Sequence, residues 1–191
     1  MAIVREIEKR RAYRAYSTET LDKETLVRLA EAAHMAPSSA NNQPWRIVTV
    51  VDPKQLDRLK ETLSGGNYWA KKAPAIAAFV TDARWSMRLA NRDYAFFELG
   101  MAAMAYQVQA VSEGLVVHPM AGFNVDEAKN VLGIAEDMTL EILMAVGKPG
   151  DIEELNEKHR ESEQGPRQRK PLDQIMSFDV WHERLAPPVK S

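Results

Sequence analysis

Apolar residues follow two different spacings along the chain, one typical of helices and one of strands. Residues 23–35 place leucines and alanines on one helical face, and Asp22 precedes them as a candidate N-cap. Residues 3–9 predict a shorter helix before it. The run 45–51, "WRIVTVV", is rich in β-branched side chains and predicts a strand. The first quarter of the chain therefore already mixes both kinds of element.

Capping residues and glycines mark the next two elements. Asp52, with Pro53 in the first turn and Gln55 at the capping-box position, predicts a helix that ends at the glycine pair 65–66. The stretch 75–82, "AIAAFVTD", is almost continuously apolar and predicts a strand that is buried on both faces.

A long helix is predicted over residues 89–113 and is closed by Gly114. It is apolar nearly all round, which implies burial on all sides. It also carries several small residues, which allow other backbones to approach closely. In a chain of this size, these features indicate a subunit interface as well as a core.

The last part of the chain contains two more strands and a charged stretch. Residues 115–123, "LVVHPMAGF", predict a strand that runs into a turn, and residues 139–150 predict another with a Gly/Pro stop. Residues 151–168 are charged and poor in apolar groups, so we predict a solvated excursion. Residues 169–191 regain apolar side chains, which predicts a tail that docks on another surface. We treat residues 1–191 as one domain, with strand connections too irregular for regular βαβ units.

Composition excludes several classes of function. The chain has 191 residues, a net charge of −2 and no cysteine. No whole-chain basic field attracts nucleic acid or a membrane, and disulfides, thiolate metal sites and a cysteine nucleophile are excluded. The four histidines lack metal-ligand spacing, so we expect no metal. Without a signal-like N-terminus or a run of about 20 apolar residues, the expected location is the cytoplasm.

Basic residues gather near both ends of the chain. Arg10, Arg11 and Arg14 lie near the start, and Arg167 and Arg169 lie near the end. Each of these residues alone is most simply explained as solvated charge. If the two clusters converge, however, their planar guanidinium groups form a site for a phosphate dianion. Neither a P-loop nor a GxGxxG pattern is present, so side chains would have to hold that phosphate.

The stretch 36–45, "APSSANNQPW", places serine, asparagine and glutamine side chains between a predicted helix and a strand. Such a mixture of donors and acceptors suits a flat heteroaromatic ring with a polyol chain. The alternative is a turn whose polar side chains satisfy its own backbone, and composition alone favours that alternative.

The order of the motifs along the chain favours a ligand-binding role for this turn over a purely structural one. "RRAYRAY", "APSSANNQPW", "HPMAGF", "GKPG" and "RQRKPL" follow one another in a series that resembles the nitroreductase family of flavin-dependent oxidoreductases. The resemblance implies an α+β fold, a three-layer α/β/α sandwich around a mostly antiparallel sheet. It also implies non-covalent FMN and an intertwined homodimer with two flavins at the subunit interface.

The resemblance also implies which residues bind FMN. One protomer would supply its basic residues and the partner its polar turn. Asn67 would contact the pyrimidine edge, and the turn 119–122 would lie near the reactive nitrogen. The implied cofactor-binding positions are Arg10, Arg11, Ala12, Arg14, Pro37, Ser38, Ser39, Asn41, Asn67, Pro119, Met120, Ala121, Gly122, Arg167 and Arg169.

The chain departs from the family pattern at two positions. Ala12 stands where the family often has serine, which removes one side-chain contact to phosphate. Ala121 aligns where many members carry glutamate, so that only a backbone contact remains. A lysine near the pyrimidine carbonyl is also expected, and Lys71 or Lys72 is the candidate.

The implied reaction is a two-step exchange centred on the flavin, with no catalytic acid–base pair required of the protein. NADH or NADPH would reduce the flavin, and a flat small molecule such as a nitroaromatic or quinone would reoxidise it. Tyr68, Trp69 and Phe97 are candidate edge residues for that acceptor, with ordinary core or interface packing as the alternative. Two other interpretations stay open: a dehalogenase-like or flavin-fragmenting reductase, and a flavin-binding protein without turnover.

Overall fold

A four-stranded antiparallel sheet forms the centre of the molecule in the computed structural model, which describes residues 3–187. The strands lie in the order β1 (Arg46–Val50), β2 (Ala75–Thr81), β6 (Thr139–Gly147) and β5 (Val116–Met120). The inner strands carry apolar side chains on both faces of the sheet. In β2, for example, Phe79 packs in the core on one face and Ile76 in the core on the other. β2 is buried along its whole length, as its composition predicts.

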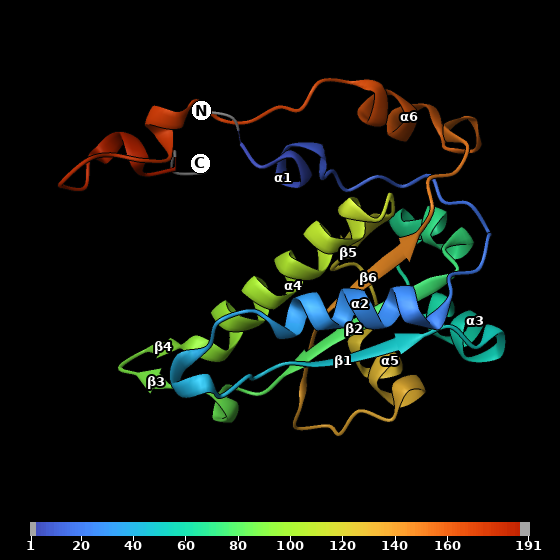
Figure 1. Ribbon diagram of the computed structural model, residues 1–191, viewed down its shortest axis with the longest axis horizontal. Helices are drawn as coiled ribbons and strands as arrows, with labels where there is room; N and C mark the ends of the chain where they lie inside the picture. The colour runs from blue at the N-terminus through green and yellow to red at the C-terminus, as the bar shows by residue number, and fades with distance from the viewer. Residues whose placement is uncertain (1–2, 188–191) are drawn as a thin grey trace.

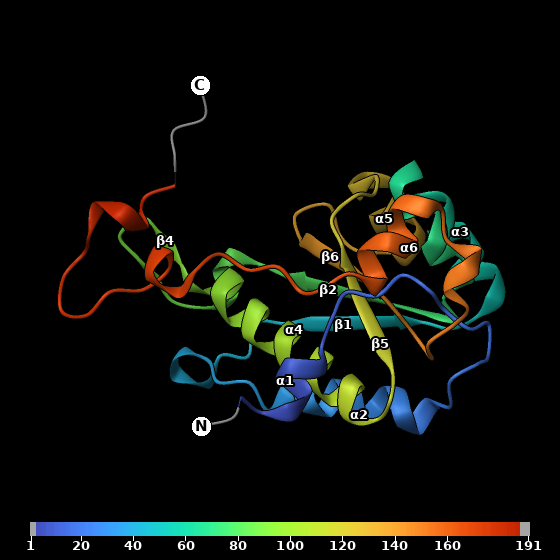
Figure 2. The same cartoon turned by 90° about the horizontal axis from the view of Figure 1, so that it is seen from above.

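Helices cover both faces of this sheet, which gives the predicted three-layer α+β arrangement (Figures 1 and 2). On one face, α2 (Lys23–His34) and α4 (Tyr94–Ser112) pack on the core that includes Phe79. On the other face lie α3 (Pro53–Glu61) and α5 (Val125–Leu132), with the 3-10 segment η2 (Gly65–Lys72). The predicted three-layer layout is thus confirmed for the single chain.

Local capping explains why several helices begin where the sequence predicts. The Asp22 carboxylate accepts a hydrogen bond from the backbone N–H of Thr25 at 2.6 Å and starts α2. Asp52 caps α3 through the N–H of Gln55, and Asn124 caps α5 through the N–H of Glu127. The short helix α1 (Arg5–Lys9) falls within the predicted range 3–9.

Two predicted boundaries are wrong, and one helix was not predicted. The long helix begins at Tyr94, because residues 88–93 form a small hairpin of β3 (Arg88–Leu89) and β4 (Arg92–Asp93) around Ala90, whose φ is +55°. α3 ends at Glu61, and the glycine pair opens η2 instead of closing α3.

The third difference concerns residues 151–168, predicted as a solvated excursion, which contain the helix α6 (Glu157–Gln164) that the sequence analysis did not identify. Its N-cap is Asn156, whose side chain accepts from the N–H of His159 at 2.9 Å, and Gly165 follows its last residue. An asparagine before a segment and a glycine after it indicate a helix. The high charge of the segment led instead to the prediction of a solvated stretch.

The segment after α6 leaves the body of the molecule and carries its apolar side chains in the open (Figures 1 and 2). Leu172, Phe178 and Trp181 are 67%, 79% and 70% exposed. Within residues 3–187, the hydrogen bonds of residues 171–187 join this tail only to itself, for example Arg184 Nε to the Asp173 carbonyl at 3.0 Å. Hydrogen bonds thus do not dock the tail on the described part of its own chain.

Candidate functional site

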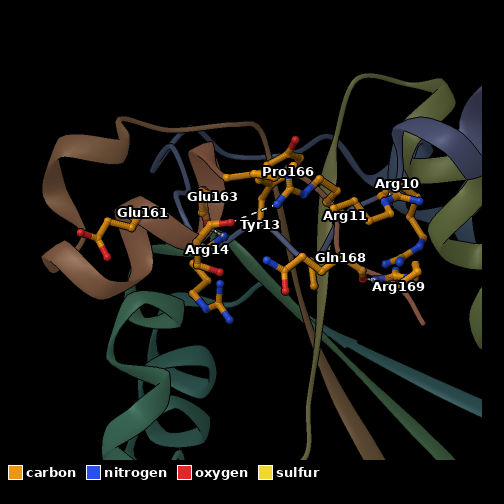
Figure 3. Close-up of a pocket in the computed structure, with 13 residues that line it drawn as sticks. Arg10, Arg11, Tyr13, Arg14, Glu161, Glu163, Pro166, Gln168 and Arg169 are labelled. Carbon is orange, nitrogen blue, oxygen red and sulfur yellow. Dashed lines mark hydrogen bonds between the residues drawn. The ribbon is translucent and has the colours of Figure 1, made fainter. Parts of the chain in front are cut away.

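The two ends of the chain meet at a cavity of about 510 Å³. One wall is the segment 10–14, which leads from α1 into the body, and the other is formed by the end of α6 and the segment after it (Figure 3). The lining residues are Arg10, Arg11, Ala12, Tyr13, Arg14, Glu161, Ser162, Glu163, Gly165, Pro166, Arg167, Gln168 and Arg169. The predicted convergence of both basic clusters is thus present in the folded chain.

Two of these arginines bind helix ends rather than pointing freely into the cavity. Arg11 donates to the carbonyls of Gly165 and Ser162 at 2.9 and 3.0 Å, at the C-terminus of α6. Arg167 donates to the carbonyls of Glu8 and Arg10 at 2.7 and 2.5 Å, at the C-terminus of α1. A guanidinium group suits these carbonyls, which have no partner within their helix. The two side chains therefore hold the terminal segments together from opposite directions.

Positive charge is concentrated at one end of the cavity, where Arg10 and Arg169 lie side by side (Figure 3). Burial, and then the charges of Arg167 and Arg169, lower the pKa of Arg10 below its ordinary value. Within residues 3–187, no carboxylate lies within 4.0 Å of the guanidinium nitrogens of these three arginines. A multiply charged anion fits this place because it would offset the mutual repulsion of the arginines.

Glu163 of α6 is a site residue that the sequence analysis missed. It is buried, and its carboxylate accepts a hydrogen bond from the backbone N–H of Arg14 at the other end of the cavity (Figure 3). Burial raises the pKa of this carboxyl group above its ordinary value. Glu163 thereby fixes the segment that carries Arg14.

Asn67 and the turn 119–122 form a second group of predicted residues. The Asn67 side-chain amide donates to the Gly122 carbonyl at 2.8 Å, and the Ser64 N–H donates to the same oxygen at 2.9 Å. A Cβ atom on Gly122 would lie 2.5 Å from Ser64 Oγ and 3.1 Å from Asn67 Nδ2, so a larger residue here would displace these two side chains. In this turn Met120 is buried and Ala121 is exposed.

His118 connects this second group to the arginine-lined segment. Its Nδ1 lies 3.1 Å from the Tyr13 carbonyl, and its ring packs against Trp69 with 4.3 Å between ring centroids. Because a carbonyl only accepts, Nδ1 carries the proton in the neutral ring. Burial is the main cause that lowers the pKa of His118 to about 4, so its ring is neutral near pH 7.

This depressed pKa predicts a specific pH dependence of stability. In the unfolded chain, His118 binds a proton below its ordinary pKa of 6.5, whereas in the folded chain it binds one only near pH 4. The contribution of His118 to the free energy of unfolding is therefore full above pH 6.5 and is lost as the pH falls toward 4. We expect the free energy of unfolding to fall by about 2 kcal/mol from pH 7 to pH 5 through this residue. Urea titrations of His118→Gln should lack this component, whereas the control His34→Gln should keep it. An equal pH dependence in both variants would contradict the assignment.

The three candidate acceptor residues lie in different surroundings. Trp69 is buried, stacks on Tyr16 and donates to the Gly66 carbonyl at 3.1 Å, so in the single chain it belongs to the core. Tyr68 stacks on His159 of α6, with 5.5 Å between ring centroids, and its hydroxyl accepts from the Asn156 N–H. Phe97 of α4 is 64% exposed.

Of the two candidate lysines, Lys72 is paired with Glu154, a residue of the segment just before α6. Lys71, its neighbour in η2, is exposed.

The polar turn with Pro37, Ser38, Ser39 and Asn41 does not line the cavity. It lies against α4 at Glu98, whereas Arg10 meets the same helix at Gln107. Nine residues at a rise of 1.5 Å separate these contacts by about 13.5 Å along the helix.

The backbone of this turn is strained. Ala40, Asn41 and Gln43 have φ values of +48°, +57° and +50°. For residues other than glycine, this left-handed region costs roughly 1–2 kcal/mol each, and Asn tolerates it best. Such strain persists only where surrounding contacts hold it, and it is often found at functional sites.

Within residues 3–187, no helix has the length and apolar character needed to cross a membrane. In the same part of the chain, no group of three or more His, Asp or Glu side chains is placed to hold a metal ion.

Comparison with known proteins gives consistent matches. A model of the nitroreductase family matches residues 7–148. An uncharacterized 15.4 kDa protein from Mycolicibacterium smegmatis is 33% identical over 133 residues, which cover 68% of this chain and 88% of that protein. An FMN reductase [NAD(P)H] from Bacillus subtilis is 28% identical over 81% of this chain, and the chain spans 59% of that longer relative.

A solved structure described as an oxidoreductase containing FMN superposes on this chain with a TM-score of 0.85 at 25% identity. The superposition covers 95% of this chain and 94% of that one. The match therefore extends over the arginine-lined cavity as well as the sheet.

Proposed function

The chain belongs to the nitroreductase family of oxidoreductases, and from this premise we propose that it binds FMN and uses NADH or NADPH to reduce flat acceptors such as nitroaromatics or quinones. An FMN reductase among its relatives and an FMN-containing oxidoreductase of the same fold support the cofactor. A cytoplasmic location is part of the proposal, supported by the absence of cysteine from the sequence.

The observation that carries this proposal is the convergence of Arg10, Arg167 and Arg169 from opposite ends of the chain, with no carboxylate within 4.0 Å of their guanidinium nitrogens in residues 3–187. An FMN phosphate would bring two negative charges to this group of arginines and offset their mutual repulsion. The fit is chemical as well as electrostatic, since guanidinium groups bind phosphate oxygens in pairs.

The contacts of the five arginines suggest a division of roles among them. We assign the direct phosphate contacts to Arg10 and Arg169. Arg11 and Arg167 already donate to backbone carbonyls and would act by holding the two walls of the cavity together. Arg14, at the other end, would place positive charge near the ring, where it favours reduction.

The remaining predicted residues would surround the ring. Asn67 would contact the pyrimidine edge, and the backbone N–H groups of Ala121 and Gly122 would face the reactive nitrogen. The turn with Ser38, Ser39 and Asn41 lies too far along α4 to belong to the same cavity of one chain, which supports its assignment to the flavin of a partner subunit. A homodimer is therefore part of the proposal.

When bound, FMN supplies the redox chemistry, accepting a hydride from the nicotinamide and passing the electrons to the acceptor. The chain itself would bind and orient the flavin and would exclude water from the site. His118 is neutral near pH 7 and adds no charge to the site, and its Nδ1–H donates to the Tyr13 carbonyl. Donor and acceptor would use the same cleft in turn.

The purified protein tests this proposal directly. We expect a yellow protein that releases FMN on denaturation and oxidises NADH or NADPH faster when a nitroaromatic or quinone is added. A bound flavin with no oxidation of either nucleotide would contradict the reductase function and favour a flavin-binding protein. Release of halide or dimethylbenzimidazole would point instead to the dehalogenase-like or flavin-fragmenting reactions.

A further inference from the structure

One buried carboxylate, Glu98 of α4, has no part in the function described so far. Its side chain belongs to a residue that is only 2% exposed. Its Oε1 accepts from the backbone N–H of Ser39 at 2.7 Å, and its Oε2 accepts from the Ser86 hydroxyl at 2.5 Å. Within residues 3–187, no Lys, Arg or His pairs with it. Since a buried charge without a cation is costly, these two hydrogen bonds are its compensation.

The Ser39 contact anchors the strained part of the polar turn. Most other hydrogen bonds of the turn are local: Ser38 Oγ accepts from the Gln43 N–H at 2.9 Å, and Arg46 donates to the Gln43 carbonyl at 3.1 Å. Thr81 reaches only the Pro44 carbonyl, beyond the left-handed residues. Within residues 3–187, Glu98 is therefore the one side chain distant in sequence that hydrogen-bonds to the turn 38–43.

The Ser86 contact attaches a second surface segment to the same carboxylate. Ser86 and Met87 precede the β3–β4 hairpin, and the side chains of Met87 and of Leu89 in β3 are 45% and 51% exposed. The polar turn and this hairpin lie at the same end of the molecule (Figure 1). One side chain thus fixes two loops relative to each other and to α4.

From this geometry we propose that Glu98 is a positioning residue, whose carboxylate keeps the turn 38–43 in its strained shape so that it is preformed to bind the flavin of the partner subunit. The inference rests on the proposed function, because it assumes that the turn reaches that flavin. A preformed turn loses less conformational freedom on binding, and this raises affinity.

The test compares Glu98→Gln with Glu113→Gln in the full-length, FMN-loaded protein. Both variants remove one negative charge at α4, but Glu113 bonds to Arg28 near the other end of the helix. In Glu98→Gln, the amide oxygen can keep the Ser39 N–H and the amide NH2 can donate to the Ser86 hydroxyl, so the Ser39 N–H keeps only a neutral acceptor, which bonds more weakly than a carboxylate. We expect hydrogen exchange of the amides of residues 39–43 to accelerate about 10-fold and the FMN dissociation constant to rise about 10-fold. Glu113→Gln should change neither.

The outcomes separate the inference from the proposed function. Unchanged exchange in residues 39–43 overturns the inference, even if wild-type protein binds FMN as proposed. Faster exchange with unchanged FMN affinity overturns the place of the turn in the flavin site. If Glu98→Gln does not fold, Ser86→Ala removes one hydrogen bond while keeping the charge, and it should accelerate the same amides by a smaller factor. Saturating FMN should restore kcat in the folded variant, with KM for the acceptor unchanged.

Discussion

Replacing both Arg10 and Arg169 by alanine is expected to weaken FMN binding by about 10³-fold. Hydrogen bonds to charged groups contribute about 1.5–3 kcal/mol each, and this change removes the two arginines assigned to the phosphate. The fold should survive, because these side chains line a cavity and repel each other in the flavin-free protein. Flavin fluorescence titration measures the affinity, and thermal unfolding of the flavin-free protein checks the fold.

The matched control is Lys54→Ala with Arg58→Ala, which removes two exposed basic residues from α3. It should leave FMN affinity unchanged. Higher salt should weaken FMN binding in the wild type more than in the Arg10/Arg169 double variant, because screening acts on the charges that the variant lacks. Equal affinity in wild type and double variant would show that the phosphate lies elsewhere.

Changing both Phe178 and Trp181 to aspartate is expected to raise the dissociation constant of the proposed homodimer, in which we expect the tail to pack on the partner subunit, by at least about 10³-fold. These side chains are 79% and 70% exposed in one chain, although aromatic groups this large usually bury 150–250 Å² each when packed. At about 25 cal/mol per Å², losing both contacts costs several kcal/mol for each tail. Sedimentation velocity at several protein concentrations measures the change.

Flavin binding should weaken together with the dimer, because the polar turn that completes each site comes from the partner in this proposal. The control Val51→Asp with Val125→Asp places the same charges at two exposed apolar positions outside the tail and should leave the dimer intact. A wild-type protein that sediments as a monomer would refute the packing of the tail on a partner subunit. A dimer that the Phe178/Trp181 variant leaves unchanged would refute it as well.

The sequence predicted most elements of this fold because the signals for them are local. An N-cap such as Asp22 or Asp52 acts on amides three residues away. The apolar content of β2 reports burial without reference to its neighbours. The errors also have a local cause. The start of α4 was misplaced because the hairpin 88–93 continues directly into an apolar helix. The helix α6 was not identified because its residues are mostly charged, although Asn156 precedes it and Gly165 follows it.

The candidate site was predictable as a set of residues but not as a set of roles. The order of the basic and polar motifs identified the family resemblance, and the folded chain brings Arg10, Arg167 and Arg169 together as that resemblance implied. Glu98 and Glu163 carried no such signal, since buried carboxylates look like any other charged residue in a sequence.

By itself, the sequence determined the mixture of helices and strands, the absence of cysteine chemistry and the motifs that carry the family likeness. Only the tertiary structure decided that Arg11 binds the Gly165 carbonyl, 154 residues away, that Glu98 accepts a hydrogen bond from the strained turn, and that within residues 3–187 the tail 171–187 hydrogen-bonds only to itself. Caps and periodicity depend on neighbours within a few residues, whereas the partner of a charge is fixed only when distant segments have packed and water has left.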